Sequence, residues 1–205
     1  IPLVLIGLHT LSKSLRRSHK NLATNWLEET IDDPIRQKWM SPAKLVERHG
    51  IQSGMIVMEI NPGSGDNAFA AAKVLGSNGR LVAVDTQDMV VEQLKAKARR
   101  SEMYNLEAHQ ADITELPFSD DSFDIVYMVT TIGDVLNPVR ALQECRRVLS
   151  KTGTLVFSEF ILDPNHPSAG MLIKLAKEAG FRLKSRSGSF WAYTLVFEKD
   201  PQMVY

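Results

Sequence analysis

The 205-residue sequence has one cysteine, Cys145, and five histidines that stand far apart. A single thiol forms no internal disulfide, and the sequence contains neither a cysteine cluster nor an HExxH motif. Disulfide scaffolds and the common structural zinc sites are therefore excluded, and no metal is expected. The setting that this cysteine usage predicts is the reducing cytoplasm.

Charge of one sign is not in excess, because 24 Lys and Arg residues balance 24 Asp and Glu residues. Nucleic-acid-binding domains usually carry a basic surplus, so no nucleic-acid partner is expected. The chain is 44% hydrophobic and 23% charged, which is ordinary for a soluble globular protein. Its length suffices for one domain with a sizeable core.

Long hydrophobic runs are also missing. The apolar run that opens the sequence, I-P-L-V-L-I-G-L-H-T-L, is shorter than the roughly 20 residues that cross a bilayer. As a helix, residues 1–20 would carry an apolar stripe beside the basic residues Lys13, Arg16, Arg17 and Lys20. This pattern suits peripheral membrane contact or the end of a membrane span further upstream. It equally suits a helix that packs on its own domain over the mouth of an active site.

An alternation of apolar runs and helical periods fills the rest of the chain. Residues 1–50 read as a helical N-terminal extension, in which Ser41 and Pro42 begin a helix that ends at Gly50. In residues 51–205, strands are predicted at 55–60, 81–85, 106–110, 123–129 and 154–160, with helices between them and a terminal hairpin over 181–197. The prediction is an α/β domain with a doubly wound, mostly parallel sheet and an antiparallel hairpin at its edge.

The segment E-I-N-P-G-S-G-D, residues 59–66, follows the first of these strands. Gly63 and Gly65 lack Cβ atoms, so the backbone can turn sharply there and approach a ligand closely. Asp85 ends the second strand, 20 residues after Gly65. A carboxylate at this separation typically accepts hydrogen bonds from ribose hydroxyls. Loop and acid together predict a ligand that contains adenosine.

Two cofactor classes fit this loop. Residues 63–68, G-S-G-D-N-A, match the dinucleotide pattern G-x-G-x-x-A, which points to an NAD(P)-dependent oxidoreductase. However, the carboxylate of Asp66 would repel a pyrophosphate at the helix N-terminus. An adenosyl sulfonium carries no phosphate and tolerates an acidic surround. Helix capping accounts for Asp66, so ligand roles are assigned to Asp85 and Asp112.

Four segments together resemble a known family. They are M-E-I-N-P-G-S-G, V-A-V-D-T-Q, A-D-I-T-E-L-P-F-S-D-D-S-F-D-I-V and A-L-Q-E-C-R-R-V-L-S-K-T-G-T-L-V-F-S-E. Over about residues 41–198, the chain is similar to the class I S-adenosylmethionine-dependent methyltransferases. Within that class it most resembles the group with the quinone-biosynthesis and other small-molecule enzymes. The resemblance implies a Rossmann-like, seven-stranded sheet of order 3-2-1-4-5-7-6. It also implies S-adenosylmethionine as cofactor and a small-molecule or lipid-like methyl acceptor.

The resemblance also implies a set of site residues. Glu59 would order the loop, and the methionine portion would be held by Asn61, Gly63, Ser64 and Gly65. The ribose would be held by Asp85, and the adenine would lie beside Thr86, Gln87, Asp112 and Ile113. The methyl group would be faced by Val129, Thr130 and Thr131. Relatives commonly have glycine where this chain has Asn61. Asn tolerates left-handed backbone angles better than other non-glycine residues, so the loop is expected to keep its shape.

Methyl transfer needs alignment of the reactants more than it needs a nucleophilic side chain. A general base is useful when the acceptor is a hydroxyl or an amine. His166, in the loop after the fifth strand, and Glu159, at the end of that strand, are the two candidates. His166 equally suits a polar surface turn, and Glu159 equally suits a capping role. A protein that binds the cofactor without catalysis is therefore also open.

Overall fold

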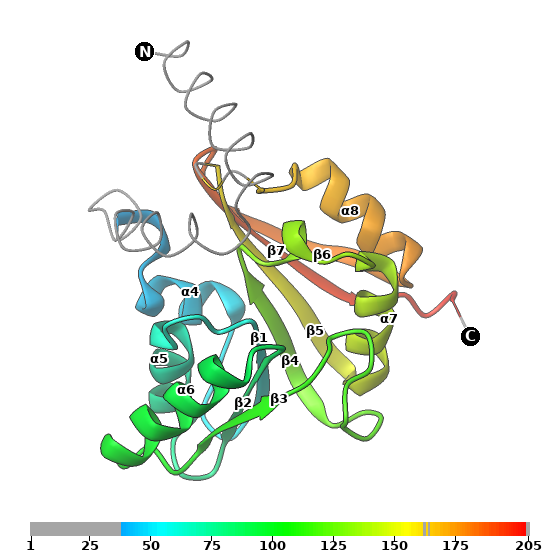
Figure 1. The fold of residues 1–205 in the computed structure, drawn as a ribbon. Coiled ribbons are helices and arrows are strands. Elements are labelled where there is room, and N and C mark those ends of the chain that lie inside the picture. Colours follow the sequence, from blue (N-terminus) through cyan, green and yellow to red (C-terminus); the bar gives the residue numbers. More distant parts are fainter. Residues whose placement is uncertain (1–37, 162, 164, 204–205) are drawn as a thin grey trace, which may run out of the picture.

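The computed structural model describes residues 38–161, 163 and 165–203 (Figure 1). Its centre is a seven-stranded sheet of order β3-β2-β1-β4-β5-β7-β6. The strands are β1 (Ile56–Ile60), β2 (Arg80–Asp85), β3 (Leu106–Gln110), β4 (Phe123–Val129), β5 (Leu149–Phe160), β6 (Phe181–Gly188) and β7 (Ala192–Lys199). Strands β1 to β5 are parallel, and β7 runs antiparallel to both β5 and β6. The predicted sheet order and terminal hairpin are confirmed.

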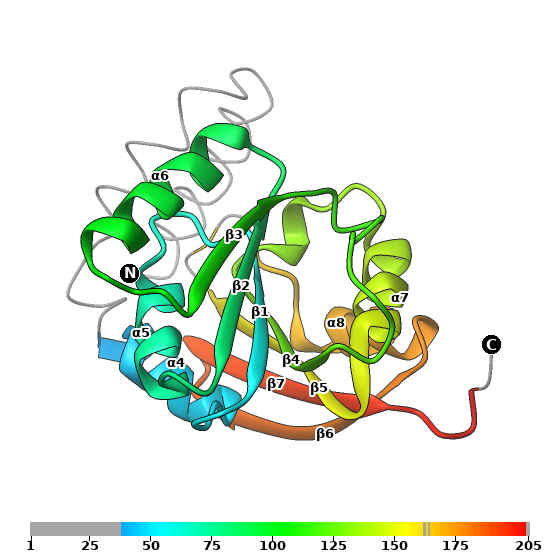
Figure 2. The same cartoon turned by 90° about the horizontal axis from the view of Figure 1, so that it is seen from below.

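Helices cover both faces of the sheet (Figures 1 and 2). One face carries α4 (Pro42–His49), α5 (Asp66–Leu75) and α6 (Asp88–Arg100), and the other carries α7 (Pro138–Val148) and α8 (Ala169–Glu178). A 3-10 turn, η1 (Ile132–Asp134), follows β4. Helix α4 begins and ends where the sequence predicted, with Pro42 in its first turn and Gly50 in a left-handed C-cap. The side chain of Ser41 makes no capping hydrogen bond.

The crossover from β3 to β4 is a loop rather than a helix. Residues 111–122 are all described, and in them Ile113 and Leu116 fill the core where a helix would otherwise pack. Two charged residues of α7 fix this loop. Glu144 accepts a hydrogen bond from the Leu116 amide, and Arg147 donates to the Leu116 and Phe118 carbonyls. The loop thereby takes the place of a crossover helix on the α7 face of the sheet.

The start of β5 differs from the sequence-based prediction. Strand β5 starts at Leu149 instead of residue 154, because α7 leads directly into it and Leu149 already pairs with Phe123. The register between β4 and β5 then shifts before Thr154 pairs with Ile125. A turn-like S-K-T-G stretch concealed this early start.

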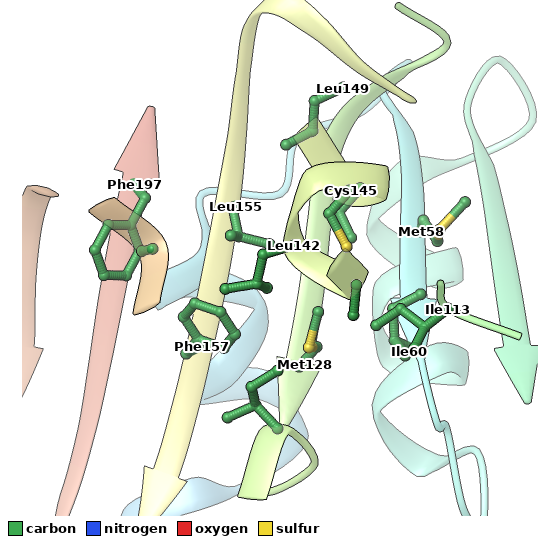
Figure 3. Packing of buried hydrophobic residues seen from close by; sticks show 14 of the residues in the cluster. Met58, Ile60, Ile113, Met128, Leu142, Cys145, Leu149, Leu155, Phe157 and Phe197 are labelled. Carbon is green, nitrogen blue, oxygen red and sulfur yellow. The ribbon is translucent and has the colours of Figure 1, made fainter. Parts of the chain in front are cut away.

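The core on the α7 side is formed by helix residues packed on alternate strand residues (Figure 3). Leu142 and Cys145 of α7 face Met128, Leu155 and Phe157 of the sheet. Cys145 is fully buried and acts as a small apolar side chain, and burial raises the pKa of its thiol. Because β1 to β5 pair in parallel, their carboxyl ends lie along one common edge of the sheet.

The N-terminal side chains of the described part also reach this edge. Trp39 and Met40 pack with Leu45, Phe160 and Ala192 near the ends of β5 and the start of β7. Residues 1–37, with the predicted membrane-contact or covering helix, lie outside the described residues. Among the described residues, none of the helices has the length and apolar character needed to cross a membrane.

Candidate cofactor and acceptor site

The loop between β1 and α5 bends through three left-handed residues. The φ angles are 53° at Asn61, 53° at Gly63 and 82° at Gly65. The Asn61 amide donates to the Val84 carbonyl at 2.8 Å, and the Gly65 amide donates to the Pro62 carbonyl at 2.9 Å. Asn61 therefore adopts the left-handed conformation that its residue type allows, and the loop keeps the expected bend.

The two glycines of this loop are needed for different reasons. A Cβ atom on Gly65 would lie 2.3 Å from Leu94 Cδ1, so Gly65 permits the close packing of α6 on the loop. A Cβ atom on Gly63 would meet no atom within 4 Å. Gly63 consequently faces open space, in which a ligand can approach the backbone of the loop.

Asp66, just after the loop, is ion-paired. Its carboxylate accepts hydrogen bonds from Lys97 Nζ at 2.9 Å and from Ser64 Oγ at 3.0 Å. Burial alone would raise the pKa of Asp66, but these bonds outweigh it and lower the pKa. The charge of Lys97 offsets part of the repulsion that Asp66 would exert on a pyrophosphate. Asp66 therefore disfavours a dinucleotide less strongly than the sequence suggested.

Asp85 and Asp112 follow neighbouring strands, because β2 pairs with β3 and Asp85 lies opposite Gln110. Asp85 is only 5% exposed, and its Oδ1 accepts from the Gln87 amide at 2.9 Å. Burial raises the pKa of Asp85, although the Gln87 and Thr86 amides counteract it.

Asp112 is exposed and accepts two hydrogen bonds from Thr114, which lower its pKa. Ile113 beside it is buried in the core, and the side chains of Thr86 and Gln87 are exposed. The structure thus gathers the predicted ribose and adenine residues along one stretch of the edge.

Glu59 belongs to a buried polar network that the sequence did not reveal. Its Oε2 accepts a hydrogen bond from Tyr127 Oη at 2.9 Å, and burial raises its pKa to about 8. His49 of α4 packs against the Tyr127 ring, with centroids 4.7 Å apart. The Nε2 atom of His49 lies 2.8 Å from Ser158 Oγ, which in turn lies 2.9 Å from Thr194 Oγ1.

Burial and the nearby Arg48 lower the pKa of His49 to about 3, so its ring is neutral at ordinary pH. The network joins a helix to four strands, β1, β4, β5 and β7, and no local pattern marks it. Its effect is to tie α4 to the strand that leads into the glycine loop.

The end of β4 is strained. Thr130 has a φ of 49°, a left-handed angle that is unfavourable for a β-branched residue. Its amide donates to the Ser158 carbonyl at 2.9 Å, which holds the turn between β4 and η1. Thr131 is buried, and Val129 and Thr130 are half-buried. Strain of this kind often accompanies functional turns.

Glu159, at the end of β5, is buried without a hydrogen bond. Its side chain is 0% exposed, and neither carboxyl oxygen has a partner among the described residues. Burial raises the pKa of Glu159 to about 8, and the charges of Asp163 and Asp134 add to the effect.

His166 is half-buried, and its Nδ1 lies 3.0 Å from the Asp163 carbonyl oxygen. A carbonyl only accepts, so Nδ1 is the donor in this contact.

The loops after β4 and β5 are in close contact beside Glu159. A Cβ atom on Gly133 would lie 2.0 Å from the Asn165 carbonyl oxygen. Asn165 Nδ2 also donates to Asp134 Oδ1 at 2.6 Å. The edge therefore has two parts: a glycine loop with acids at β1–β3, and a pair of touching loops around a buried carboxyl at β4–β5.

Comparison with known proteins links this arrangement to a family. The family model described as a methyltransferase domain matches residues 51–186. A ubiquinone/menaquinone biosynthesis C-methyltransferase UbiE of Marinomonas sp. is 28% identical over 72% of this chain and 57% of its own length. A demethylmenaquinone methyltransferase of Staphylococcus aureus is 32% identical over 57% of this chain and 47% of its own. The chain thus spans about half the length of these curated relatives.

Solved structures agree on the fold. A SAM-dependent methyltransferase of Aquifex aeolicus has a TM-score of 0.75 at 21% identity, over 82% of this chain and 95% of that one. The [4+2]-cyclase SpnF has a TM-score of 0.68 at 16% identity, over 78% and 79%. At these identities the likeness concerns the fold alone. With the family match, it shows that the chain belongs to the methyltransferase-domain family of class I, whose methyl donor is S-adenosylmethionine.

Proposed function

We propose that this protein transfers a methyl group from S-adenosylmethionine to a small-molecule or lipid-like acceptor. The observation that carries the proposal is the open face of Gly63 beside the carboxylates of Asp85 and Asp112. The backbone at Gly63 admits a ligand with no steric cost, and carboxylates accept hydrogen bonds from ribose hydroxyls and an adenine amino group. The residues present therefore fit S-adenosylmethionine.

The binding roles that we propose are those that the family resemblance implies. Asn61, Gly63, Ser64 and Gly65 would hold the methionine portion through the backbone of the loop. Asp85 would accept from the ribose hydroxyls, with Thr86 and Gln87 alongside, and Asp112 would accept from the adenine amino group over Ile113. Glu59 would order the loop from the protein interior, because its side chain is buried and hydrogen-bonded to Tyr127.

The acceptor is proposed to bind at the β4–β5 part of the edge, next to Val129, Thr130 and Thr131. S-Adenosylmethionine supplies a methyl group on a sulfonium, and the protein's main task is to align the acceptor atom with it. Alignment alone contributes about 7–11 kcal/mol in favourable cases. His166 and Glu159 are the candidate bases, and proton transfer by such a group adds roughly 10²–10⁴ in rate.

The two curated relatives act in quinone biosynthesis, by their names, and this supports a small-molecule acceptor. Family membership argues against the NAD(P)-dependent alternative. The cofactor-binding protein without methyl transfer is a separate outcome. Binding of S-adenosylhomocysteine without turnover on a broad acceptor panel would support it.

A matched pair of glycine variants tests the cofactor site. Gly63→Ala and Gly54→Ala both place an alanine at positive φ, 53° and 85°, with no atom within 4 Å of the new Cβ. Both should lower the free energy of unfolding by a similar amount, about 1–2 kcal/mol. Calorimetric titration should show that only Gly63→Ala weakens S-adenosylhomocysteine binding, by about tenfold or more, because its Cβ enters the ligand's space. Equal affinities of the two variants would contradict the proposed site.

A further inference from the structure

The buried carboxyl of Glu159 is a polar group with nothing in the described structure to satisfy it. A buried polar side chain without a partner is costly, and such groups are rare in native proteins. Glu159 stands out further because it lies at the ligand edge of a central strand, where ligands bind in open α/β sheets. A ligand with a hydrogen-bond donor would satisfy this carboxyl.

The surroundings of Glu159 are acidic. It lies on the same face of the sheet as its register partner Tyr193, whose hydroxyl donates to the Pro167 carbonyl and not to Glu159. The negative charges of Asp134 and Asp163 act on it from the loops after β4 and β5. The guanidinium group of Arg186, on β6, lies over the Tyr193 ring, 5.6 Å from its centroid. An anionic group would be repelled here, whereas a cationic hydrogen-bond donor would meet three carboxyls.

We propose that Glu159 is the acceptor-recognition residue, and that the acceptor carries an amine whose ammonium form pairs with the Glu159 carboxylate at the carboxyl end of β5. This assignment rests on the proposed methyltransferase function and narrows its acceptor class.

The proton balance follows from the burial of Glu159. With a pKa of about 8, the carboxyl is protonated at neutral pH before the amine binds. When an ammonium ion binds, the Glu159 carboxyl releases this proton to solvent, because only its carboxylate form makes an ion pair with the ammonium group. The carboxylate can next accept the proton on the nitrogen, which leaves a lone pair on that atom for methyl transfer. Glu159 would thus both recognise the amine and prepare its nitrogen.

Three probes of similar shape and different charge test the inference on the full chain. Phenethylamine, phenethyl alcohol and phenylacetate share a phenyl ring and differ in charge. With S-adenosylhomocysteine present and absent, ligand-observed NMR should show that the amine binds about tenfold or more tightly than the alcohol, and that phenylacetate binds most weakly. Glu159→Gln should remove the preference for the amine. Glu107→Gln, an exposed carboxyl of β3 paired with Arg80, is the control and should retain it.

Proton release gives a second readout that a structural role of Glu159 would not produce. Calorimetry of the amine at pH 7 in phosphate and in Tris should report release of about one proton by the wild type and by Glu107→Gln, and none by Glu159→Gln. The amine's affinity should also rise about tenfold per pH unit up to about pH 8 in the wild type. Among the described residues, the charged or titratable groups on the elements packed around Glu159 are Asp134, Asp163, His166, Tyr193 and Arg186. They are unchanged in the variant, so the difference reports on Glu159.

Any of four results would overturn the inference. These are binding without a charge preference, a preference for the alcohol or the acid, no saturable binding of the amine, and equal proton release by the wild type and Glu159→Gln. These outcomes are separate from failure of the proposed function. That failure would appear as a loss of S-adenosylhomocysteine binding by the wild type, which is measured first and without any acceptor.

Discussion

At the β1–β3 part of the ligand edge, Asp66, Asp85 and Asp112 all accept hydrogen bonds from nearby residues, whereas at β5 the Glu159 carboxyl accepts none among the described residues. In the first part, hydrogen bonds within the protein hold the carboxylates in place. In the second part, the Glu159 carboxyl lacks a hydrogen-bond partner among the described residues, and a ligand could supply one. A cofactor common to a whole family suits the first condition, and an acceptor that differs between relatives suits the second.

The largest expected effect concerns Glu159 and the pH dependence of stability. The folded pKa of about 8 lies above the ordinary value of 4.5, so between these pH values the folded chain holds a proton that the unfolded chain has lost. Stability should therefore fall as pH rises through this window, by at most about 1.4 kcal/mol per pH unit.

Glu159→Gln removes this contribution. From pH 5 to pH 8, urea unfolding should show that the wild type loses about 2–4 kcal/mol more than the variant. His49 and Glu59 also titrate with shifted pKa values, but they are the same in both proteins and cancel in the comparison. Glu107→Gln serves as the control and should follow the wild type. Parallel curves for wild type and Glu159→Gln would mean that Glu159 is not a buried neutral acid.

An intermediate effect is expected for Asp85 in the organised part. Asp85→Ala removes the acceptor proposed for the ribose hydroxyls, and the loss should weaken S-adenosylhomocysteine binding by about 1.5–3 kcal/mol, the magnitude of one hydrogen bond to a charged group. Calorimetric titration measures it directly. Asp121→Ala removes an acid that is paired with Lys199 near the start of β4 and should leave the affinity unchanged. If the Asp85 and Asp121 variants bind equally well, the ribose assignment is wrong.

The smallest effect is expected for Lys97. Lys97→Met breaks the pair with Asp66, in which both side chains are substantially exposed, at 40% and 62%. Exposed pairs contribute about 1 kcal/mol or less, so stability and S-adenosylhomocysteine affinity should change little. Lys95→Met, on the same helix and paired with Glu92, is the matched control. A tenfold loss of affinity in Lys97→Met alone would show that the loop depends on this pair.

The shape of the glycine loop was predictable because its signals are local. A glycine loop after an apolar strand, and an acid 20 residues further on, are visible in the sequence, and Asn61 adopts the left-handed angle that its residue type suggested. The sheet order followed from the resemblance of four segments, and the antiparallel hairpin from the alternation in residues 181–197.

The remainder depends on contacts between distant segments. His49, Tyr127 and Ser158 meet only because α4 packs across β4 and β5, and Lys97 reaches Asp66 from another helix. The sequence placed Glu159 at a strand end but gave no sign that it would be buried without a partner. Burial and satisfaction of a polar group are properties of packing, which a local pattern does not encode.

The most direct test of the account is calorimetric titration of the wild-type chain with S-adenosylhomocysteine and, separately, with NADH. The account predicts saturable one-to-one binding of S-adenosylhomocysteine and no binding of NADH. Binding of NADH with no detectable binding of S-adenosylhomocysteine would contradict it.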